Sequence, residues 1–454
     1  MKYTAILDPK FQPMELTLRE FDKKVAAAEN QPISIALERT QGLCERYDFN
    51  IFADGIDDEL NFAIVERYIK TLLWVFGGWK IYICGSKKVF DHINAAYHPG
   101  GLREFDYNFM SRVYERTFEV VYVENIADMP SVKRGASAIG RHLNGCRIGF
   151  DAGGSDRKVS AVIDGEAVYS EEVIWHPKTQ SDPEYHYQGI MDSFRTAASK
   201  MPKVDAIGVS TAGVTIDNRI MVASLFIKVN DEDFEKHVKN IYIDAAKELG
   251  NVPVIVANDG DVTALAGAMD MGENGILGIA MGTSEAGGYV DQAGNITGWL
   301  NELAFVPVDF NKEAMVDEWS GDFGCGVKYF SQDGVIKLAP AAGIELDESL
   351  TPAEKLKVVQ NLMAEKDPRA AKIYETIGVY FGYSIAYYAR FYDISHVLIM
   401  GRVTSGEGGV ILLDRAKEVL AGEFPELAEK IQLNIPSEAS RRVGQSIAAA
   451  SLPE

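Results

Sequence analysis

Positive charge is scarce in this chain of 454 residues. It has 45 lysines and arginines against 66 aspartates and glutamates, which gives a formal net charge of −21. Such a charge repels nucleic-acid backbones and anionic lipid surfaces, so we expect neither nucleic acid nor a membrane as partner. An anionic ligand would then need a local site made of backbone N–H groups, a helix N-terminus or Mg²⁺.

Cysteine is also rare, and none of the four cysteines stands in a C-x-x-C pair. This spacing argues against a zinc knuckle and against the disulfide framework of a secreted protein, and it favours the cytoplasm. The start, MKYTAILDPK, has no basic region followed by an apolar run, so no signal peptide is expected. The most apolar late stretch, residues 379–400, is interrupted by Arg390, Asp393 and His396, which indicates a buried helix and a strand rather than a membrane span.

Long polar or repetitive tracts are absent too, and 47% of the residues are hydrophobic, as in an ordinary globular protein. The length exceeds the roughly 250 to 300 residues that one core usually supports, so two or three packed units are expected. No G-x-x-x-x-G-K-[ST] loop occurs, which excludes a simple P-loop enzyme.

Two segments share one order of strands and helices. From residue 147 the sequence predicts an antiparallel meander (RIGF, VSAVID, VYSEEVIW), a helix over 188–200, the strand AIGVST, a helix over 231–249, and the strand VPVIVAND running into the helix DVTALAGAMD. A second set begins with GILGIAM, YVDQAG and a third strand around AFVPVD, and continues with helices over 352–391 and the strand HVLIM. We therefore expect two similar α/β lobes, at 146–262 and 263–439, with a ligand in the crevice between them and the C-terminal helix 440–454 completing the first lobe.

Residues 1–145 are expected to form an additional α+β domain. Two strands, a helix and a strand (ISIALERTQGLCERYDFNIF, ELNFAIVERYIKTLLWVFGG, WKIYICG) follow the order found after residue 147, but without the glycine turn. The domain is thus either a degenerate lobe or an unrelated α+β cap. Its helices do not have the basic character of a DNA-reading helix-turn-helix.

Two glycine turns are candidate phosphate sites. Asp151 to Ser155 (DAGGS) lies between two strands, where glycines let backbone N–H groups approach an anion and the aspartate can hold Mg²⁺ through water. Lys158 follows and could contact a phosphate. Gly282, Thr283 and Ser284 occupy the equivalent turn of the second lobe. Either turn alone is compatible with a plain hairpin, but a triphosphate across a cleft needs a clamp from each side.

Two further positions follow predicted strands. Asn258 and Asp259 stand at a strand end, where the carboxylate could take a proton from a substrate hydroxyl; the alternative is a plain turn or helix cap. Gly401 follows the strand VLIM and leaves room for a flat base against the backbone, or it only begins a helix-entry loop.

Taken in order, the segments FDAGGS, VSTAG, PVIVAND, GIAMGTSEAGG, GWLNELAFVPVD and LIMGRV resemble the repressor, open reading frame and sugar kinase (ROK) family of the actin, hexokinase and heat-shock ATPase superfamily. The resemblance covers about residues 146–452. It implies a two-lobed actin/hexokinase-like (ribonuclease H-like) α/β fold and an ATP- and Mg²⁺-dependent kinase that phosphorylates a hydroxyl of a sugar-like small molecule. A homodimer is left open as the assembly state.

The resemblance also implies residue roles. Asp259 would be the catalytic base, and Asn258 and Glu302 would bind sugar hydroxyls. Gly401 would border adenosine. The first phosphate loop would consist of Asp151, Gly153, Gly154 and Ser155, and the second of Gly282, Thr283 and Ser284.

The chain departs from the family pattern at several of these places. Phe305 stands where the family has a sugar- and zinc-contacting histidine, and Cys325 alone represents its cysteine cluster, so no zinc is expected. Val327 replaces a glutamate. Glu285 and Asp261 add acids that would repel phosphate unless they face away or hold a cation. A catalytically silent ligand sensor is therefore the main alternative to a kinase, and a transcriptional repressor is a third reading.

Overall fold

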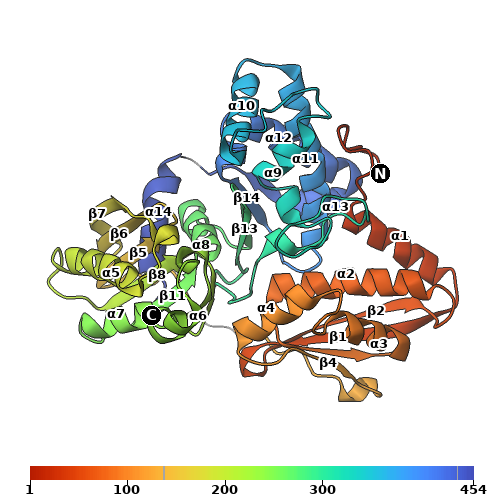
Figure 1. Ribbon diagram of the computed structural model, residues 1–454, viewed down its shortest axis with the longest axis horizontal. Coiled ribbons are helices and arrows are strands. Elements are labelled where there is room, and N and C mark those ends of the chain that lie inside the picture. Colours follow the sequence, from red (N-terminus) through yellow and green to blue (C-terminus); the bar gives the residue numbers. More distant parts are fainter. Residues whose placement is uncertain (136–138, 437) are drawn as a thin grey trace.

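The computed structural model describes residues 1–135, 139–436 and 438–454 of the chain. Three larger sheets, each covered by helices, form three units that meet near the centre of the molecule (Figure 1). The predicted α/β fold class, with an additional N-terminal part, is confirmed.

The N-terminal unit is built on a four-stranded sheet in the order β2-β1-β3-β4. Strand β1 pairs antiparallel with β2 and β3, and β3 pairs parallel with β4. Its elements are α1 (Met14–Ala26), β1 (Asn30–Glu38), β2 (Cys44–Phe52), α2 (Asp58–Phe76), β3 (Lys80–Cys84), α3 (Lys87–Ala96), α4 (Glu104–Tyr114) and β4 (Glu119–Tyr122).

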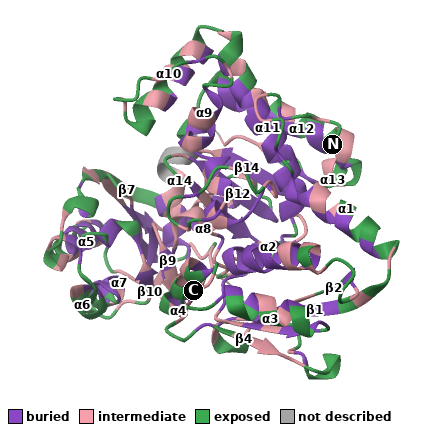
Figure 2. Ribbon diagram, turned by 45° about the vertical axis from the view of Figure 1, so that its right-hand side comes forward, coloured by how far each residue is buried: buried purple, intermediate pink, exposed green. Residues whose placement is uncertain are grey.

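Helix α2 is the most deeply buried element of this unit (Figure 2). Asp57 caps its N-terminus by accepting a hydrogen bond from the backbone N–H of Leu60. From Ile64 to Phe76 every residue of α2 is buried, because its own sheet covers one side and the second lobe covers the other. A helix that is buried on all sides forms part of the shared core rather than an outer cover.

The first lobe has a five-stranded sheet in the order β11-β8-β5-β6-β7, and the predicted antiparallel meander is confirmed there. Its strands are β5 (Cys146–Ala152), β6 (Asp156–Ile163), β7 (Glu166–Ile174), β8 (Ala206–Thr211) and β11 (Val254–Asn258), with the hairpin β9 (Val214–Ile216) and β10 (Arg219–Val222) beside them. Strand β8 pairs parallel with β5, whereas β3 in the N-terminal unit pairs antiparallel with β1, so the two units differ in topology.

The helices of the first lobe are α5 (Pro183–Ala198), α6 (Asp231–Asp233), α7 (Ile241–Glu248) and α8 (Asp259–Met271). The prediction of one continuous helix over 231–249 is wrong. A wider π-helical turn, Phe234–Val238, separates α6 from α7, and it buries Phe234 and Val238 in the core of the lobe.

The second lobe has a four-stranded sheet in the order β13-β12-β14-β15. The prediction of a third meander strand around residues 304–309 is wrong: Leu303–Phe305 forms a 3₁₀ turn, and Pro307, which has no N–H, makes only an isolated bridge to Cys325. The elements are β12 (Ile276–Met281), β13 (Glu285–Val290), α9 (Gln332–Leu338), α10 (Pro352–Ala364), α11 (Pro368–Tyr388), β14 (His396–Met400), α12 (Glu407–Glu423), α13 (Pro425–Lys430) and β15 (Gln432–Asn434).

Helix α14 (Glu438–Ala450) returns to the first lobe and packs across β5 and β8. Two glycines in the strands permit this close approach. A Cβ atom on Gly149 would lie 1.8 Å from the carbonyl oxygen of Ser446, and one on Gly208 would lie 1.6 Å from that of Ala449. Within the described residues no helix is long and apolar enough to cross a membrane.

Substitution Gly208→Ala should lower the free energy of unfolding by at least about 1–3 kcal/mol, because the added methyl group has to displace helix backbone. Urea denaturation measures the change. Gly444→Ala in α14 is the matched control, since its Cβ would meet Ala266 at an ordinary 3.6 Å; it should be neutral or stabilising by up to about 1 kcal/mol. Equal losses in both variants would contradict the packing argument.

Candidate functional site

Asp259 lies at the first residue of α8, directly after β11. The side chain of Asn258 caps this helix by accepting a hydrogen bond from Gly260 N–H at 2.8 Å. Gly260 also packs on the second lobe, where a Cβ atom would lie 2.1 Å from the carbonyl oxygen of Gly287. The start of α8 is thus fixed at the junction of the two lobes.

Asn258 also has a structural role. Its Nδ2 donates a hydrogen bond to the carbonyl of Gly213 at 2.8 Å, and its Oδ1 accepts from Gly260. The helix cap foreseen as an alternative is therefore present. One N–H and one lone pair of this amide remain for a ligand.

Four carboxyl groups of the site interact electrostatically. Burial, and then the charges of Asp259 and Asp261, raise the pKa of Glu302 to about 7. Burial raises the pKa of Asp151 to about 6, opposed by a hydrogen bond from Ser210 at 2.9 Å and increased by the charge of Asp259. Burial likewise raises the pKa of Asp259, against the Gly260 N–H and the charge of Lys178. The residues singled out in the sequence therefore do meet in one acidic region.

Asp261 is bound by groups of the second lobe. It accepts hydrogen bonds from Tyr289 N–H at 3.0 Å and Asn301 Nδ2 at 2.8 Å, and burial raises its pKa to about 7. Tyr392 donates to Asn301 Oδ1 at 2.9 Å, so Asn301 is held from two sides in its left-handed conformation, with φ of 53°. The expected repulsion between Asp261 and phosphate is replaced by a role in holding the loop before Glu302.

The first glycine turn is joined to a residue that the sequence did not reveal. Trp175 donates its indole N–H to the carbonyl of Gly153 at 2.8 Å, and the next turn, Pro177–Thr179, brings Lys178 over Gly154. A Cβ on Gly154 would lie 3.3 Å from Lys178 Nζ. Ser155 is exposed, whereas Lys158 forms an ion pair with Asp156 at 3.4 Å. Lys178, unlike Lys158, forms no ion pair among the described residues.

The second glycine turn is open on its outer side. Thr283 and Ser284 are exposed, and a Cβ on Gly282 would meet only the carbonyl oxygen of Ser284, at an ordinary 3.8 Å. Gly401, with φ of 98°, packs directly against the backbone of Met281. The next residue, Arg402, donates from Nη2 to Thr283 Oγ1 at 2.6 Å and brings a second cation that the sequence motifs did not indicate.

Glu285 begins β13 and turns inward from this loop. It is 3% exposed, and neither carboxylate oxygen has a hydrogen-bond partner among the described residues. Burial, and then the charge of Glu302, raise its pKa well above the ordinary range, which favours the neutral form. The carboxyl group is buried in the interior, whereas Thr283 and Ser284 of the turn are exposed.

The segment carrying Glu302 is attached to the end of α2. The backbone N–H groups of Leu300, Asn301 and Glu302 donate to the carbonyls of Phe76, Val75 and Trp74 at 3.3, 3.0 and 3.0 Å. These carbonyls belong to the last turn of α2 and have no partner within the helix. The N-terminal unit thereby fixes the backbone of a candidate substrate residue.

The sequence matches the family model described as "ROK family" over residues 147–448, which is well over half of the chain. The chain belongs to the ROK family. No curated protein sequence matches it significantly.

Solved structures of ROK proteins share the fold. The ROK hexokinase from Thermus thermophilus has a TM-score of 0.52 at 18% identity, covering 68% of this chain and 97% of its own. A ROK family transcriptional regulator, a homologue of the E. coli MLC protein, has a TM-score of 0.52 at 16% identity over 68% and 79%. A ROK family protein from Streptococcus pneumoniae TIGR4, solved with sucrose, has a TM-score of 0.50 at 11% identity over 67% and 97%.

Phe305, where the resemblance led us to expect a histidine in the family, packs against aromatic rings of the N-terminal unit. Its ring centroid lies 4.3 Å from that of Trp74 and 5.5 Å from that of Phe105. A histidine at this point would face an apolar partner, whereas a phenylalanine gains contact area.

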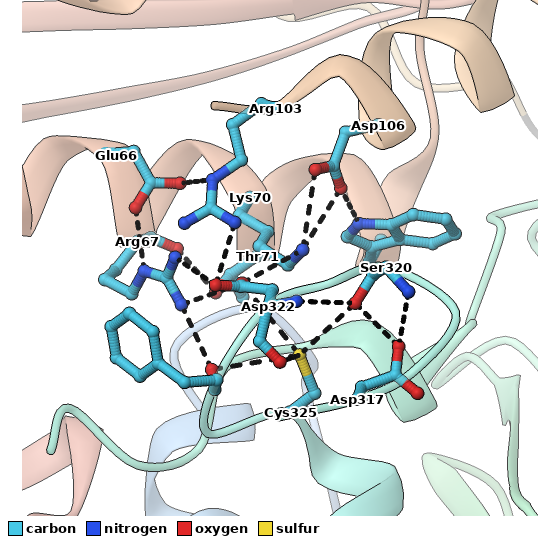
Figure 3. Close-up of polar contacts among 12 residues, drawn as sticks. Glu66, Arg67, Lys70, Thr71, Arg103, Asp106, Asp317, Ser320, Asp322 and Cys325 are labelled. Atoms are coloured by element: carbon cyan, nitrogen blue, oxygen red, sulfur yellow. Dashed lines mark hydrogen bonds and ion pairs between the residues drawn. The ribbon is translucent and has the colours of Figure 1, made fainter. Parts of the chain in front are cut away.

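The loop around Cys325, where the resemblance led us to expect a cysteine cluster, is held by a buried ion cluster (Figure 3). Asp322 forms ion pairs with Arg67 at 2.9 Å, Lys70 at 3.1 Å and Arg103 at 2.8 Å. Glu66 pairs with Arg67 at 2.8 Å and also with Arg103, and Asp106 pairs with Lys70 at 3.3 Å. We call these six residues the α2 ion cluster: Glu66, Arg67, Lys70, Arg103, Asp106 and Asp322.

The α2 ion cluster balances three cations with three anions, and only Asp322 comes from outside the N-terminal unit. Asp322 is 3% exposed. Burial alone would raise its pKa, but the charges of Lys70 and Arg67 hold that pKa below its ordinary value. Cys325 contacts Asp322, and burial raises the pKa of its thiol to about 12. Among the described residues no group of three or more histidine, cysteine, aspartate and glutamate side chains is arranged to hold a metal.

Substitution Asp322→Asn should lower the free energy of unfolding by about 3–5 kcal/mol, because it leaves three buried cations against two anions. Urea denaturation followed by circular dichroism measures this. Asp48→Asn is the control: Asp48 pairs with Arg46 but is 59% exposed, so its loss should cost less than about 1 kcal/mol. A small, equal effect in both variants would show that the cluster does not anchor the loop.

Proposed function

We propose that the protein transfers a phosphoryl group from a nucleotide triphosphate, ATP with Mg²⁺, to a hydroxyl of a sugar-like molecule. The observation that carries the proposal is the position of Asp259, a half-buried carboxylate at the start of α8, where Gly260 packs against Gly287 of the second lobe and where the charge of Asp259 acts on Asp151 beside the first glycine turn. Family membership supports the same reaction class. The supporting structures are under 25% identical and bear on the fold only.

The two turns are suited to hold phosphates. Gly153, Gly154 and Ser155 on one side, and Gly282, Thr283 and Ser284 on the other, offer backbone N–H groups and hydroxyls. Lys178 and Arg402 add one cation to each turn, which offsets the acidic surroundings. Gly401 packs beside the second turn and would border the adenosine.

Asp151 is the carboxylate that would face Mg²⁺, through water. It accepts one side-chain hydrogen bond, from Ser210, which leaves lone pairs of the carboxylate for such water. Burial raises the pKa of Asp151, and a nearby cation would favour its ionised form. The metal ion would supply charge neutralisation of the phosphates.

Asp259 would accept the proton of the attacking hydroxyl. Because burial raises its pKa, the carboxylate is a stronger base than an exposed aspartate, yet Lys178 keeps the ionised form accessible. The transferring phosphoryl group needs little covalent assistance, so positioning by α8 and the glycine turns contributes most.

Glu302 and the free N–H of Asn258 would bind substrate hydroxyls. Phe305 and Val327 remove two polar partners that ROK sugar kinases are expected to have, and Phe305 is packed on Trp74. We therefore propose a substrate with fewer hydroxyls, or with apolar substituents, in preference to glucose.

A catalytically silent ligand sensor is the alternative from a different class. It would keep ligand binding without consuming nucleotide. An ADP-release screen of purified protein against sugars, amino sugars and polyols separates the two, because a sensor releases no substrate-dependent ADP.

If Asp259 is the base, Asp259→Asn should lower turnover by about 10²- to 10⁴-fold while nucleotide affinity stays the same. Steady-state kinetics and titration calorimetry with ADP measure the two effects. Asp156→Asn, at the start of β6 beside the first glycine turn, is the comparison and should alter turnover much less. Unchanged turnover in Asp259→Asn would remove the mechanism.

The pH profile should show the raised pKa of Asp259. Activity requires the ionised carboxylate, so kcat/KM should fall as pH decreases through a pKa above the ordinary aspartate value. Lys178 lowers that pKa. Lys178→Gln should therefore move the acid limb to higher pH, by less than about one unit because Lys178 is exposed. Lys203→Gln, distant in sequence and paired with Asp205, should leave the limb in place; a downward shift in Lys178→Gln would contradict the assignment.

A further inference from the structure

A cavity of about 450 Å³ lies where the N-terminal unit faces the first lobe. It is large enough for a small molecule such as a monosaccharide derivative. Its walls come from three parts of the chain, and the residues that matter here are Arg39, Tyr114, Asn218, Asn258, Trp299 and Leu300.

Arg39 is a buried cation without a counterion. It is 7% exposed, its Nη2 donates to the carbonyl of Gly298, and its Nε has no hydrogen-bond partner. It forms no ion pair with a carboxylate of the described residues, in contrast to Arg67 and Arg103, which are equally buried and fully paired. Arginine stays charged in proteins, and an unpaired buried charge is costly.

The acidic residues of the cavity do not serve as that counterion. Asp261 is bound by Tyr289 N–H and Asn301 Nδ2, and Asp217 is exposed at the turn between β9 and β10. Tyr114 interacts with Arg39 but supplies no negative charge: burial raises the pKa of its hydroxyl, although the charge of Arg39 and a hydrogen bond with it oppose the rise. The cavity thus combines one unbalanced positive charge with apolar walls such as Trp299 and Leu300.

The cavity adjoins the proposed site of phosphoryl transfer. Asn258 lines it, and the next residue is Asp259. The wall segment that Arg39 holds at Gly298 continues through Leu300 and Asn301 to Glu302. Asp259 and Glu302 themselves lie outside the cavity lining, so a ligand in the cavity would extend toward them from one end.

We propose that the substrate carries an anionic group, a carboxylate or a phosphate, which Arg39 binds while a hydroxyl of the same molecule faces Asp259. This rests on the proposed kinase function for the hydroxyl end, whereas the anion site stands on the cavity and Arg39. The planar guanidinium matches both anions through paired N–H donors. With a net charge of −21, the protein needs such a local cation to retain an anionic substrate.

Titration calorimetry on the full chain tests the anion site directly. The probes are D-gluconate and D-glucuronate for carboxylates, D-glucose 6-phosphate for a phosphate, and D-glucose as the neutral reference. At least one acidic probe should bind about tenfold or more tightly than glucose, and the carboxylate and phosphate arms show which anion is preferred. If no acidic probe binds more tightly than glucose, the proposal is wrong.

Three variants locate the effect. Arg39→Gln should remove the advantage of the acidic probe and leave glucose binding within about twofold, and Arg39→Lys should retain part of it. Arg46→Gln, in the same unit but away from the cavity, should change neither. If Arg39→Gln weakens the binding of acidic and neutral probes equally, and Arg39→Lys binds the acidic probe no more tightly than Arg39→Gln does, Arg39 has a structural role and the proposal is wrong.

ADP release separates the two proposals. Tight, Arg39-dependent binding of an acidic probe without ADP release from any sugar acid would support the anion site and contradict the kinase. Efficient phosphorylation of neutral sugars that is indifferent to Arg39→Gln would support the kinase and contradict the anion site.

Discussion

The attachment of α2 to the segment that follows residue 299 is the constraint on which the rest of the site depends. Three carbonyls at the end of α2 accept hydrogen bonds from Leu300, Asn301 and Glu302, and no water is needed to satisfy either set of groups. Because α2 is buried between its own sheet and the second lobe, it cannot shift without exposing its apolar side chains. The N-terminal unit is therefore part of the site's framework, although the family match begins only at residue 147.

Electrostatics explain why this framework has to be stiff. Burial raises the pKa values of the four carboxyl groups of the site, and the charge of a neighbouring carboxylate raises three of these values further. When they are ionised, the four groups repel one another: Asp151, Asp259, Asp261 and Glu302. Backbone packing at Gly260 and Gly288 and the hydrogen bonds to Asn301 oppose that repulsion. Lys178 and Arg402 provide positive charge at the two glycine turns, which favours an anion at those turns.

The sequence predicted features that local chemistry determines. The strand ending at Asn258, the meander after residue 147 and the glycine turns follow from hydrophobic alternation and from glycine spacing, and the structure has all three. Lys178, Arg402 and Arg39 carry no local signal, because a lone cation in a polar segment resembles any surface residue until the fold brings it to a glycine turn or a cavity. The third strand near residue 305 was predicted from alternation alone. In the structure this segment is a 3₁₀ turn, in which Phe305 packs against Trp74 and Phe105. Whether the residues assigned to catalysis and substrate binding act as proposed stays a prediction.

The α2 ion cluster extends the same constraint to the other side of Glu302. Asp322 fixes the loop that ends at Cys325, and this loop supports the chain beyond Glu302: Val308 N–H donates to Gly324 O at 2.8 Å, and Gly326 N–H donates to Val306 O at 2.9 Å. Buried ion pairs add little net stability compared with apolar packing, but they tolerate only one arrangement of partners. The three cations of the α2 ion cluster need the carboxylate of Asp322, so their charge is balanced only when the Asp322 loop is correctly placed. The N-terminal unit therefore fixes this loop by charge, whereas a metal-bound cysteine cluster would fix it by coordination. Glu302 is thus held through α2 carbonyls before it and through the Asp322 loop after it, and α2 contributes to both attachments, with Arg103 beside α4 adding to the second.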